Sequence, residues 1–320
     1  MTEQPKFRIL SLDGGGVRGL LSARILENLE KYLDAREGRP KPLGERFDFI
    51  VGTSTGAILA AGLASGLTAR RLHEIYAQDI PNIFPPKSSL ASWCGPKYSQ
   101  APLRELLKEH FGDTRLADLE TDLCITAVDL QTGRPRLYKT GYLKRNQGRL
   151  EEPLVEAVLA SAAAPTYFPP VTTLAHSSYL VDGGLCANNP AMVALVDALQ
   201  FEHPGKVSGS HPAGDLNQVV MVSLGTGMAC GMPYDSEQLI GAGIWRWAKP
   251  VIELTFQSQS HLVHAQVSFL LKERYLRIDP PLPFAVKLDD AAALPRLASL
   301  GDLNQAQTQW IEQHLTGESE

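Results

Sequence analysis

The sequence predicts an α/β fold in which helices cover a mostly parallel sheet. Short apolar segments with strand character alternate along the chain with longer segments that have helical periodicity. Two of the strands run into glycine-rich turns that open directly into helices, an order typical of parallel sheets. The 320 residues, of which 44% are hydrophobic and 20% charged, suit a single globular domain covering residues 1–320.

The N-terminal part of the chain contains both of these strand–turn–helix units. Residues 7–12 form the first expected strand, which leads into the turn at residues 13–16. A helix follows, because leucine or isoleucine recurs every four residues from Leu21 to Leu33. The second unit repeats this order, with a strand at residues 47–51, a turn at residues 52–56 and an alanine-rich helix.

The rest of the chain continues the alternation. Further strands are expected at residues 123–128, 136–139, 179–181 and 219–224, and helices at residues 151–161, from Asn189 onward and at residues 306–315. Two proline-rich stretches, residues 80–98 and 280–295, are expected to be irregular. We find no internal repeat and no linker between domains.

Charge and composition exclude several classes of function. The net charge of −5, without a basic block, argues against binding to a nucleic-acid polymer. The N-terminus lacks a secretory signal, and the uncharged run at residues 57–67 is shorter than the ~20 residues that span a bilayer. The protein is therefore expected to be cytoplasmic. Its four cysteines are widely spaced and are expected to be free thiols: Cys94, Cys124, Cys186 and Cys230.

The second glycine-rich turn has the pattern of a nucleophile elbow. Gly52, Ser54 and Gly56 form Gly-x-Ser-x-Gly between a strand and a helix. The serine of such an elbow lies on a tight, strained turn, where side chains at the glycine positions would collide with the neighbouring strand and helix. The N-terminus of the following helix favours developing negative charge. Ser54 is therefore the predicted nucleophile.

The first glycine-rich turn allows two interpretations. Gly14, Gly16 and Gly19 satisfy Gly-x-Gly-x-x-Gly, the dinucleotide-binding pattern, and Asp34 lies about 20 residues downstream. In either interpretation backbone N–H groups hold negative charge, which is a pyrophosphate in a nucleotide enzyme or an oxyanion in an acyl hydrolase. Asp34 falls within the first helix rather than after a second strand. The second strand instead delivers Ser54, which favours the oxyanion.

A serine nucleophile needs a base, and histidine is the usual choice. None of the eight histidines stands just after an expected strand in a catalytic turn, and His261 and His264 lie on an expected helix. Asp182 ends a strand, and Gly183 and Gly184 leave its carboxylate room to approach another turn. A lone Asp-Gly-Gly is usually only a tight turn, so the absence of a well-placed histidine is the main independent argument for Asp182.

In their order, these motifs resemble those of the patatin-like phospholipase family. The motifs are Asp13-Gly14-Gly15-Gly16-Val17-Arg18-Gly19, Gly52-Thr53-Ser54-Thr55-Gly56 and Asp182-Gly183-Gly184. Similar connecting segments are Ser161 to Pro165, Tyr167 to Pro170, Ser223 to Gly227 and Tyr275 to Arg277. The resemblance covers a core of about residues 7–278 and leaves residues 279–320 as a tail without an assigned role.

The resemblance implies a three-layer α/β/α fold and a lipid acyl hydrolase with a Ser54–Asp182 dyad. Ser54 would attack a phospholipid acyl ester, Asp182 would accept the proton, and water would release the fatty acid. The backbone amides of Gly14, Gly15 and Gly16 would form the oxyanion hole. No metal or organic cofactor is implied.

Two further expectations concern the residues around this dyad. Arg18 either assists the oxyanion site or braces its turn, and the remaining motif positions support the turns: Gly19, Gly52, Gly56, Gly183 and Gly184. Burial should raise the pKa of Asp182 above that of a free aspartate and make it a better base.

A phospholipid substrate requires contact with a membrane, at its inner face for a cytoplasmic enzyme. The candidate contact residues are apolar: Ile83, Phe84, Leu90, Trp93, Trp245 and Trp247. For Trp245 and Trp247 a place in the core or in a lid is favoured over membrane contact. Some bacterial patatin-like enzymes are switched on by a cyclic nucleotide in antiviral defence. The size of this chain suits such an effector, but no residue marks a nucleotide pocket.

Three alternatives stay open on the sequence alone. The first is an α/β-hydrolase esterase with His261 or His264 as its base. The second is a nucleotide-binding oxidoreductase that uses the turn from Gly14 to Gly19. The third is an inactive scaffold that acts as a binding module.

Overall fold

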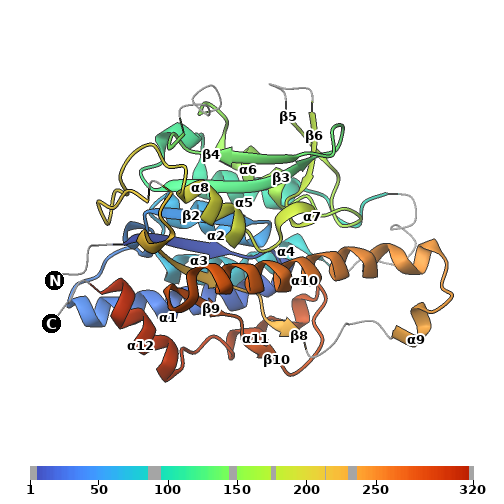
Figure 1. Cartoon of the computed structure of the whole chain (residues 1–320). Coiled ribbons are helices and arrows are strands. Elements are labelled where there is room, and N and C mark those ends of the chain that lie inside the picture. Colours follow the sequence, from blue (N-terminus) through green and yellow to red (C-terminus); the bar gives the residue numbers. More distant parts are fainter. Residues whose placement is uncertain are drawn as a thin grey trace.

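The computed structural model describes residues 6–85, 95–143, 150–173, 178–212, 214–229 and 236–316. An eight-stranded sheet crosses it in the order β5-β6-β3-β2-β1-β7-β9, with β4 beside β3 (Figure 1). The strands are β1 (Phe7–Leu12), β2 (Phe49–Thr53), β3 (Asp122–Asp129), β4 (Pro135–Lys139), β5 (Val171–Thr173), β6 (Ser178–Asp182), β7 (Val219–Leu224) and β9 (Tyr275–Ile278). A two-stranded sheet pairs β8 (Met228–Ala229) with β10 (Pro281–Leu282).

Helices surround the large sheet. They are α1 (Gly19–Glu37), α2 (Thr55–Ala64), α3 (Ala69–Gln78), α4 (Ile80–Ile83), α5 (Ala101–Phe111), α6 (Leu154–Ser161), α7 (Gly184–Ala187), α8 (Ala191–Ala198), α9 (Ser236–Leu239), α10 (Ile244–Leu271), α11 (Leu294–Ala298) and α12 (Gln305–Leu315). Short 3-10 turns are η1 (Gly16–Arg18), η2 (Leu43–Arg46), η3 (Leu116–Asp118), η5 (Leu216–Gln218), η6 (Lys272–Arg274) and η7 (Ala291–Ala293). No helix in the described ranges is both long and apolar enough to cross a membrane.

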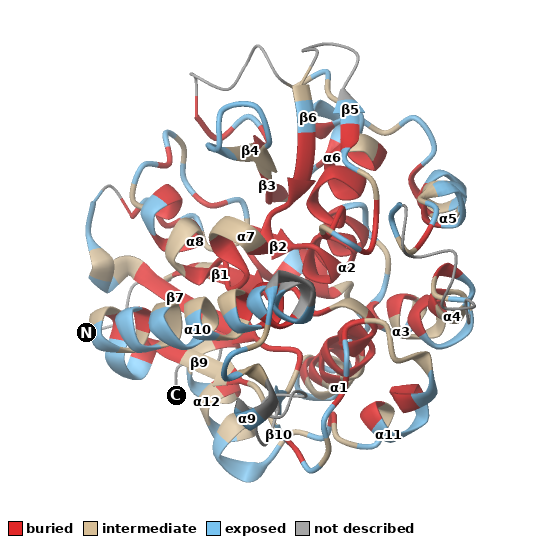
Figure 2. Ribbon diagram, turned by 90° about the vertical axis from the view of Figure 1, so that its right-hand side faces the viewer, coloured by how far each residue is buried: buried red, intermediate tan, exposed pale blue. Residues whose placement is uncertain are grey.

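The strands alternate their side chains between two separate hydrophobic layers. On β1, Leu10 and Leu12 belong to the layer packed under α1, α2 and α6, whereas Phe7 and Ile9 belong to the layer under α8 and α10. Such alternation is what a sheet buried on both faces requires. Buried residues accordingly fill both sides of the sheet in Figure 2. The predicted three-layer α/β/α fold with a mostly parallel sheet is confirmed.

The antiparallel pairing of β6 with β3 brings the Ser54 motif and the Asp182 motif next to each other. Within β3, Cys124 pairs with β2 on one edge and β4 on the other, whereas Ala127 pairs with β4 and β6. Strands β2 and β6 therefore share one edge of β3 and run toward each other. Thr53, the last residue of β2, lies opposite Thr126, and Asp182, the last residue of β6, lies opposite Ala127. The ends of the two strands thus meet head to head.

The C-terminal tail, whose role the sequence left open, packs onto the core. Residues of α11 and α12 enter the same hydrophobic layer as the first helix: Leu294, Leu297, Ile311 and Leu315. Asn28 of α1 also donates to the carbonyl of Gly301 at 2.9 Å. Residues 279–316 therefore cover the outer face of α1. This is the part of the chain that the family resemblance did not reach.

Several boundaries differ from those expected. The stretch at residues 80–98, expected to be a loop, begins with the helix α4, and residues 86–94 lie outside the described part. The stretch at residues 280–295 contains β10 and η7. Several elements were not anticipated as such, among them α3, α5, the full length of α10, and the edge strand β9. Cys124 and Cys186 are free thiols, as expected, and Cys94 and Cys230 lie outside the described residues.

Candidate active site

Ser54 lies at the junction of β2 and α2, in a backbone conformation rare for a residue with a side chain. Its φ is 54° and its ψ is −118°, so the turn is strained in the way expected for a nucleophile elbow. The N–H of Ser54 donates to Ser161 Oγ at 2.8 Å, which holds the turn from outside. A Cβ on Gly52 would lie 2.3 Å from the carbonyl oxygen of Gly56, and a Cβ on Gly56 2.2 Å from that of Leu12. Only glycine fits both positions.

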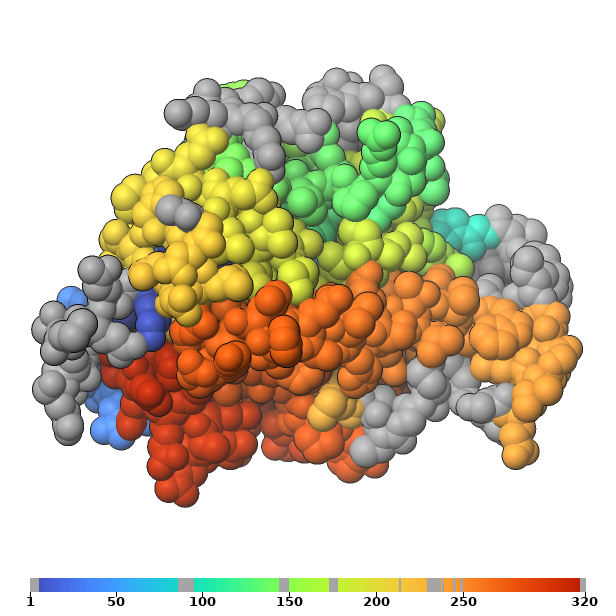
Figure 3. All heavy atoms as spheres, viewed as in Figure 1, coloured from blue at the N-terminus to red at the C-terminus, as the bar shows by residue number. Residues whose placement is uncertain are grey.

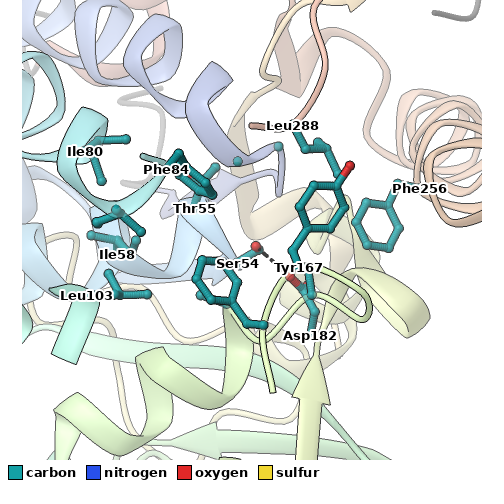
Figure 4. A pocket seen from close by; sticks show the side chains of 16 residues that line it. Ser54, Thr55, Ile58, Ile80, Phe84, Leu103, Tyr167, Asp182, Phe256 and Leu288 are labelled. Atoms are coloured by element: carbon teal, nitrogen blue, oxygen red, sulfur yellow. Dashed lines mark hydrogen bonds between the residues drawn. The ribbon is translucent and has the colours of Figure 1, made fainter. Parts of the chain in front are cut away.

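The hydroxyl of Ser54 donates to Asp182 Oδ2 at 2.7 Å (Figure 4). The other carboxylate oxygen, Oδ1, accepts the N–H of Gly184 at 2.7 Å. Asp182 is fully buried, and no arginine, lysine or histidine in the described residues forms an ion pair with it. Burial raises the pKa of Asp182 to about 7, against the opposing effect of the bonds from Gly184 and Ser54. The expectation of a raised pKa is confirmed.

The two glycines after Asp182 let it approach β2 this closely. A Cβ on Gly183 would lie 2.1 Å from Thr126 Oγ1, and one on Gly184 would lie 2.7 Å from the ring of Phe256. Thr126 in turn shares a 2.7 Å hydrogen bond with Thr53, next to Ser54. Larger residues at either glycine would push the carboxylate away from the elbow.

The glycine loop, residues 14–16, borders the same place. Gly15 and Gly16 line the pocket that contains Ser54 and Asp182. Gly16 has a φ of 58°, and a Cβ there would lie 2.1 Å from the carbonyl oxygen of Leu288. Glycine is therefore required at this position by both conformation and space.

The structure corrects the expected role of one residue of this loop. The N–H of Gly14 donates to the carbonyl of Asn188 at 2.9 Å, so it is not free to bind an oxyanion. No acceptor among the described residues engages the N–H groups of Gly15 and Gly16. The pair of free donors is thus Gly15 and Gly16. No local pattern pointed to Asn188, which lies far along the chain in the segment after α7.

Arg18 braces the loop from behind. Its Nε donates to the carbonyl of Gly15 at 3.4 Å, and its side chain lines a second cavity rather than the pocket of Ser54. Of the two roles left open by the sequence, the geometry matches the bracing one. Gly19 starts α1, where a Cβ would lie 2.1 Å from Thr55 Oγ1.

Arg277 on β9 anchors the residue before the glycines. It forms two hydrogen bonds with Asp13, at 2.9 Å and 2.6 Å, and a third with Asp279 at 2.8 Å. Burial raises the pKa of Asp13 to about 6, although Arg277 acts to lower it. The segment from Tyr275 to Arg277 therefore fixes the position of the glycine loop through an ion pair that spans β1 and β9.

The pocket in front of Ser54 is lined mainly by apolar side chains. Its volume is about 560 Å³, including the part open to solvent. Thr55 and Tyr167 also line the pocket, and most of the remaining lining is hydrocarbon from several elements: Ile58, Ile80, Ile83, Phe84, Leu103, Phe168, Phe256 and Leu288 (Figure 4). An elongated hydrocarbon group would suit such a lining.

This pocket changes the interpretation of two expected membrane residues. Ile83 is buried, and Phe84 packs edge-on against Tyr98 with ring centroids 5.2 Å apart, so both form the pocket wall rather than an exposed surface. Leu90 and Trp93 lie outside the described residues, as does the side chain of Trp245. Trp247 is partly exposed on α10.

The tail also reaches the pocket. Leu288 lines it, and the carbonyl of Leu288 accepts the N–H of Val17 at 2.9 Å. The next residue, Asp289, accepts a 2.8 Å hydrogen bond from Tyr98 and forms an ion pair with Lys97. Residues beyond the resemblance therefore close one side of the pocket, which sequence reasoning missed.

Comparison with known proteins agrees with this architecture. A family model described as patatin-like phospholipase matches residues 10–195. The chain belongs to the patatin-like phospholipase family. It is 33% identical over 305 residues to a cGAMP-activated phospholipase of Escherichia coli, covering 88% of this chain and 82% of the relative. A cGAMP-activated phospholipase of Vibrio cholerae is 32% identical over 330 residues, covering 92% and 89% of the two chains.

The chain is also similar to a plant protein. Patatin-like protein 2 of Arabidopsis thaliana is 30% identical over 333 residues, which cover 92% of this chain and 81% of the relative. The chain is thus a phospholipase-type lipid acyl hydrolase, and membership overturns the α/β-hydrolase and oxidoreductase alternatives. His261 and His264 line the second cavity and not the pocket of Ser54, and Asp34 pairs with Arg46.

The pKa of Asp182 leads to a testable pH dependence. Since only the ionised carboxylate can accept a proton, we expect kcat/KM for a soluble ester to fall about tenfold per pH unit below the pKa of about 7. The profile would be recorded between about pH 5 and pH 9. Asp182→Asn should lower the rate throughout and abolish this limb, whereas the exposed Asp302→Asn should leave it in place. An acidic limb near pH ~4, typical of a free aspartate, would contradict the expectation.

Proposed function

We propose that the protein cleaves fatty acyl esters of membrane phospholipids through Ser54 and Asp182. The observation that carries the proposal is the 2.7 Å hydrogen bond from the strained Ser54 to the buried Asp182, both of which line a mainly apolar pocket. Ser54 Oγ attacks the ester carbonyl while its proton passes to Asp182. The N–H groups of Gly15 and Gly16 stabilise the oxyanion, and the acyl chain lies along the apolar lining.

The remaining steps use the same carboxyl group. Asp182 returns its proton to the departing lysophospholipid oxygen as the carbon–oxygen bond of the tetrahedral intermediate breaks. Asp182 then takes a proton from water, which attacks the acyl-enzyme carbonyl. Collapse of this second intermediate breaks the bond to Ser54 Oγ, which regains a proton from Asp182, and the fatty acid leaves. A pKa near neutrality suits Asp182 for accepting and returning the proton in turn.

The serine is tested by labelling with a fluorophosphonate probe and mapping the modified peptide. We expect the label on Ser54, and Ser54→Ala should lose both the label and phospholipid hydrolysis, by a factor of about 10⁴ or more. The exposed Ser65→Ala, at the end of α2, is the matched control and should keep both. Turnover that survives in Ser54→Ala would refute the assignment.

We propose that α10 carries the contact with the inner face of the membrane. Its exposed apolar residues recur at helical spacing along one face: Trp247, Val251, Leu254, Leu262 and Phe269. From Pro250 to Leu271 the only carboxylate, lysine or arginine is Glu253, which is buried. Figure 3 shows α10, in orange, crossing the surface of the molecule. The same helix supplies Phe256 to the pocket wall, so membrane contact would bring lipid toward Ser54.

The membrane surface is tested by comparing two substrates. The double change Leu262→Ser and Phe269→Ser should lower hydrolysis of phospholipid vesicles about tenfold or more, since each side chain contributes about 1.5–3 kcal/mol when buried in hydrocarbon. Hydrolysis of a soluble short-chain ester should stay unchanged. Leu130→Ser removes a leucine of similar exposure, 57% against 59% for Leu262, from the hairpin turn after β3 and serves as control. Equal losses on both substrates would count against α10.

We further propose that a cyclic nucleotide raises this activity, as in an antiviral effector. The names of two relatives at 33% and 32% identity, both cGAMP-activated phospholipases, support this. We expect cyclic GMP–AMP to increase hydrolysis of phospholipid vesicles about tenfold or more, a coupling of the size usual for allosteric ligands. A panel of other cyclic di- and trinucleotides gives the specificity. An unchanged rate across the panel, with no binding by calorimetry, would rule out this regulation.

A further inference from the structure

A short segment after the aspartate turn contacts both turns of the proposed dyad. We call residues 186–188 the junction segment; it covers the end of α7 and the residue that follows. The N–H of Ala187 donates to the carbonyl of Gly183 at 2.8 Å, next to the aspartate of the dyad. The carbonyl of Ala187 accepts Thr53 Oγ1 at 2.6 Å, next to the serine. The junction segment therefore ties the aspartate turn to the nucleophile elbow.

The last residue of the junction segment reaches the glycine loop. The carbonyl of Asn188 accepts the N–H of Gly14 at 2.9 Å. Gly14 directly precedes Gly15 and Gly16, whose N–H groups are the proposed oxyanion donors. A shift of the Asn188 carbonyl would move the start of the loop and change the direction of both donors. All three motifs of the site thus meet at the junction segment.

One side chain of α10 clamps the junction segment. Gln259, which is partly buried, accepts the N–H of Asn188 with Oε1 and donates with Nε2 to the carbonyl of Cys186. A carboxamide matches this pair of backbone groups, because it presents an acceptor and a donor side by side. A carboxylate or a thioether of similar length lacks the donor. The glutamine therefore fits this place through its chemistry as well as its size.

The peptide between Ala187 and Asn188 is held from both sides. Its C=O accepts the hydroxyl of Thr53, and its N–H donates to Gln259. In a trans peptide these two groups point in opposite directions, so the two partners together fix the peptide plane. Without Gln259 the plane could turn about the Thr53 hydrogen bond and would carry the Asn188 carbonyl away from Gly14.

Neighbouring residues of α10 seat the helix at the same place. Ser260 Oγ accepts the side-chain amide of Asn188 at 2.9 Å, and the carbonyl of Ser260 accepts that of Asn189 at 3.4 Å. Phe256, three residues before the glutamine, packs so closely on Gly184 that a Cβ there would lie 2.7 Å from its ring. The position of Gln259 is therefore fixed on both sides along the helix, and the clamp is held in register with the junction segment.

We infer that Gln259 is a positioning residue for acyl transfer, which aligns the oxyanion donors of Gly15 and Gly16 through the junction segment. The clamp itself stands on the hydrogen bonds of Gln259, whereas its effect on turnover rests on the proposed function of Ser54. Gln259 lies beyond residues 10–195, the part of the chain that the family model matches. Its role follows from contacts between α10 and the segment after the aspartate turn.

The effect on turnover is tested with a soluble short-chain ester. Gln259→Met keeps the length of the side chain and removes both hydrogen bonds to the junction segment. We expect kcat to fall about tenfold or more, because the oxyanion donors lose their alignment, and KM to change less than about twofold. Gln266→Met makes the same change at an exposed position of α10 and should leave kcat unchanged. An unchanged kcat in Gln259→Met, a loss confined to KM, or equal effects of the two substitutions would overturn the inference.

Hydrogen–deuterium exchange of the full chain tests the clamp without using activity. In Gln259→Met the peptides that carry the N–H groups of Gly14 and Asn188 should exchange about tenfold faster or more, while β7 keeps its protection and shows that the chain is folded. Unchanged exchange at both places, or protection lost equally throughout the chain, would contradict the clamp. Fluorophosphonate labelling of wild-type Ser54 separates the two levels: if labelling fails, the proposed function is wrong, while the exchange result still decides the clamp.

Discussion

The hydrogen bond between Ser54 and Asp182 depends on two strands that end against each other along one edge of β3. Because β6 runs antiparallel to β3 and β2 runs parallel to it, their carboxyl ends converge. No long side chain has to bridge a gap, and an aspartate, with one methylene, reaches the serine directly. In the proposed dyad, the order of the sheet thus does what a histidine does in other serine hydrolases, where it spans the distance between nucleophile and carboxylate.

This arrangement has a cost in stability. Ser54 has a positive φ, and Asp182 is buried without a basic partner in the described structure. The folded protein binds the proton of Asp182 more tightly than the unfolded chain does, so the free energy of unfolding falls as pH rises between the unfolded value of 3.8 and about 7. The hydrogen bonds from Gly184 and Ser54 offset part of this cost. The proposed catalytic role of the pair is consistent with this cost, since strain and buried charge collect at functional sites.

The sequence was most informative at positions where only glycine fits. Gly52 and Gly56 mark the elbow because a Cβ at either would meet backbone atoms, and Gly183 marks the approach of Asp182 for the same reason. The sequence could not show that Asn188 occupies the N–H of Gly14, or that Leu288 closes the pocket. Both contacts join residues far apart in the chain and leave no local periodicity or turn signal.

The head-to-head meeting of β2 and β6 also determines where this chain can change its length. One extra residue inside either strand would shift Ser54 or Asp182 by ~3.3 Å and turn its side chain to the opposite face of the sheet. An insertion at the exposed turn around Gly133 moves neither, because both strands are registered on β3 before that turn begins. We therefore expect changes of loop length to be tolerated at the rim of the sheet, whereas the spacing along β3 has to stay fixed.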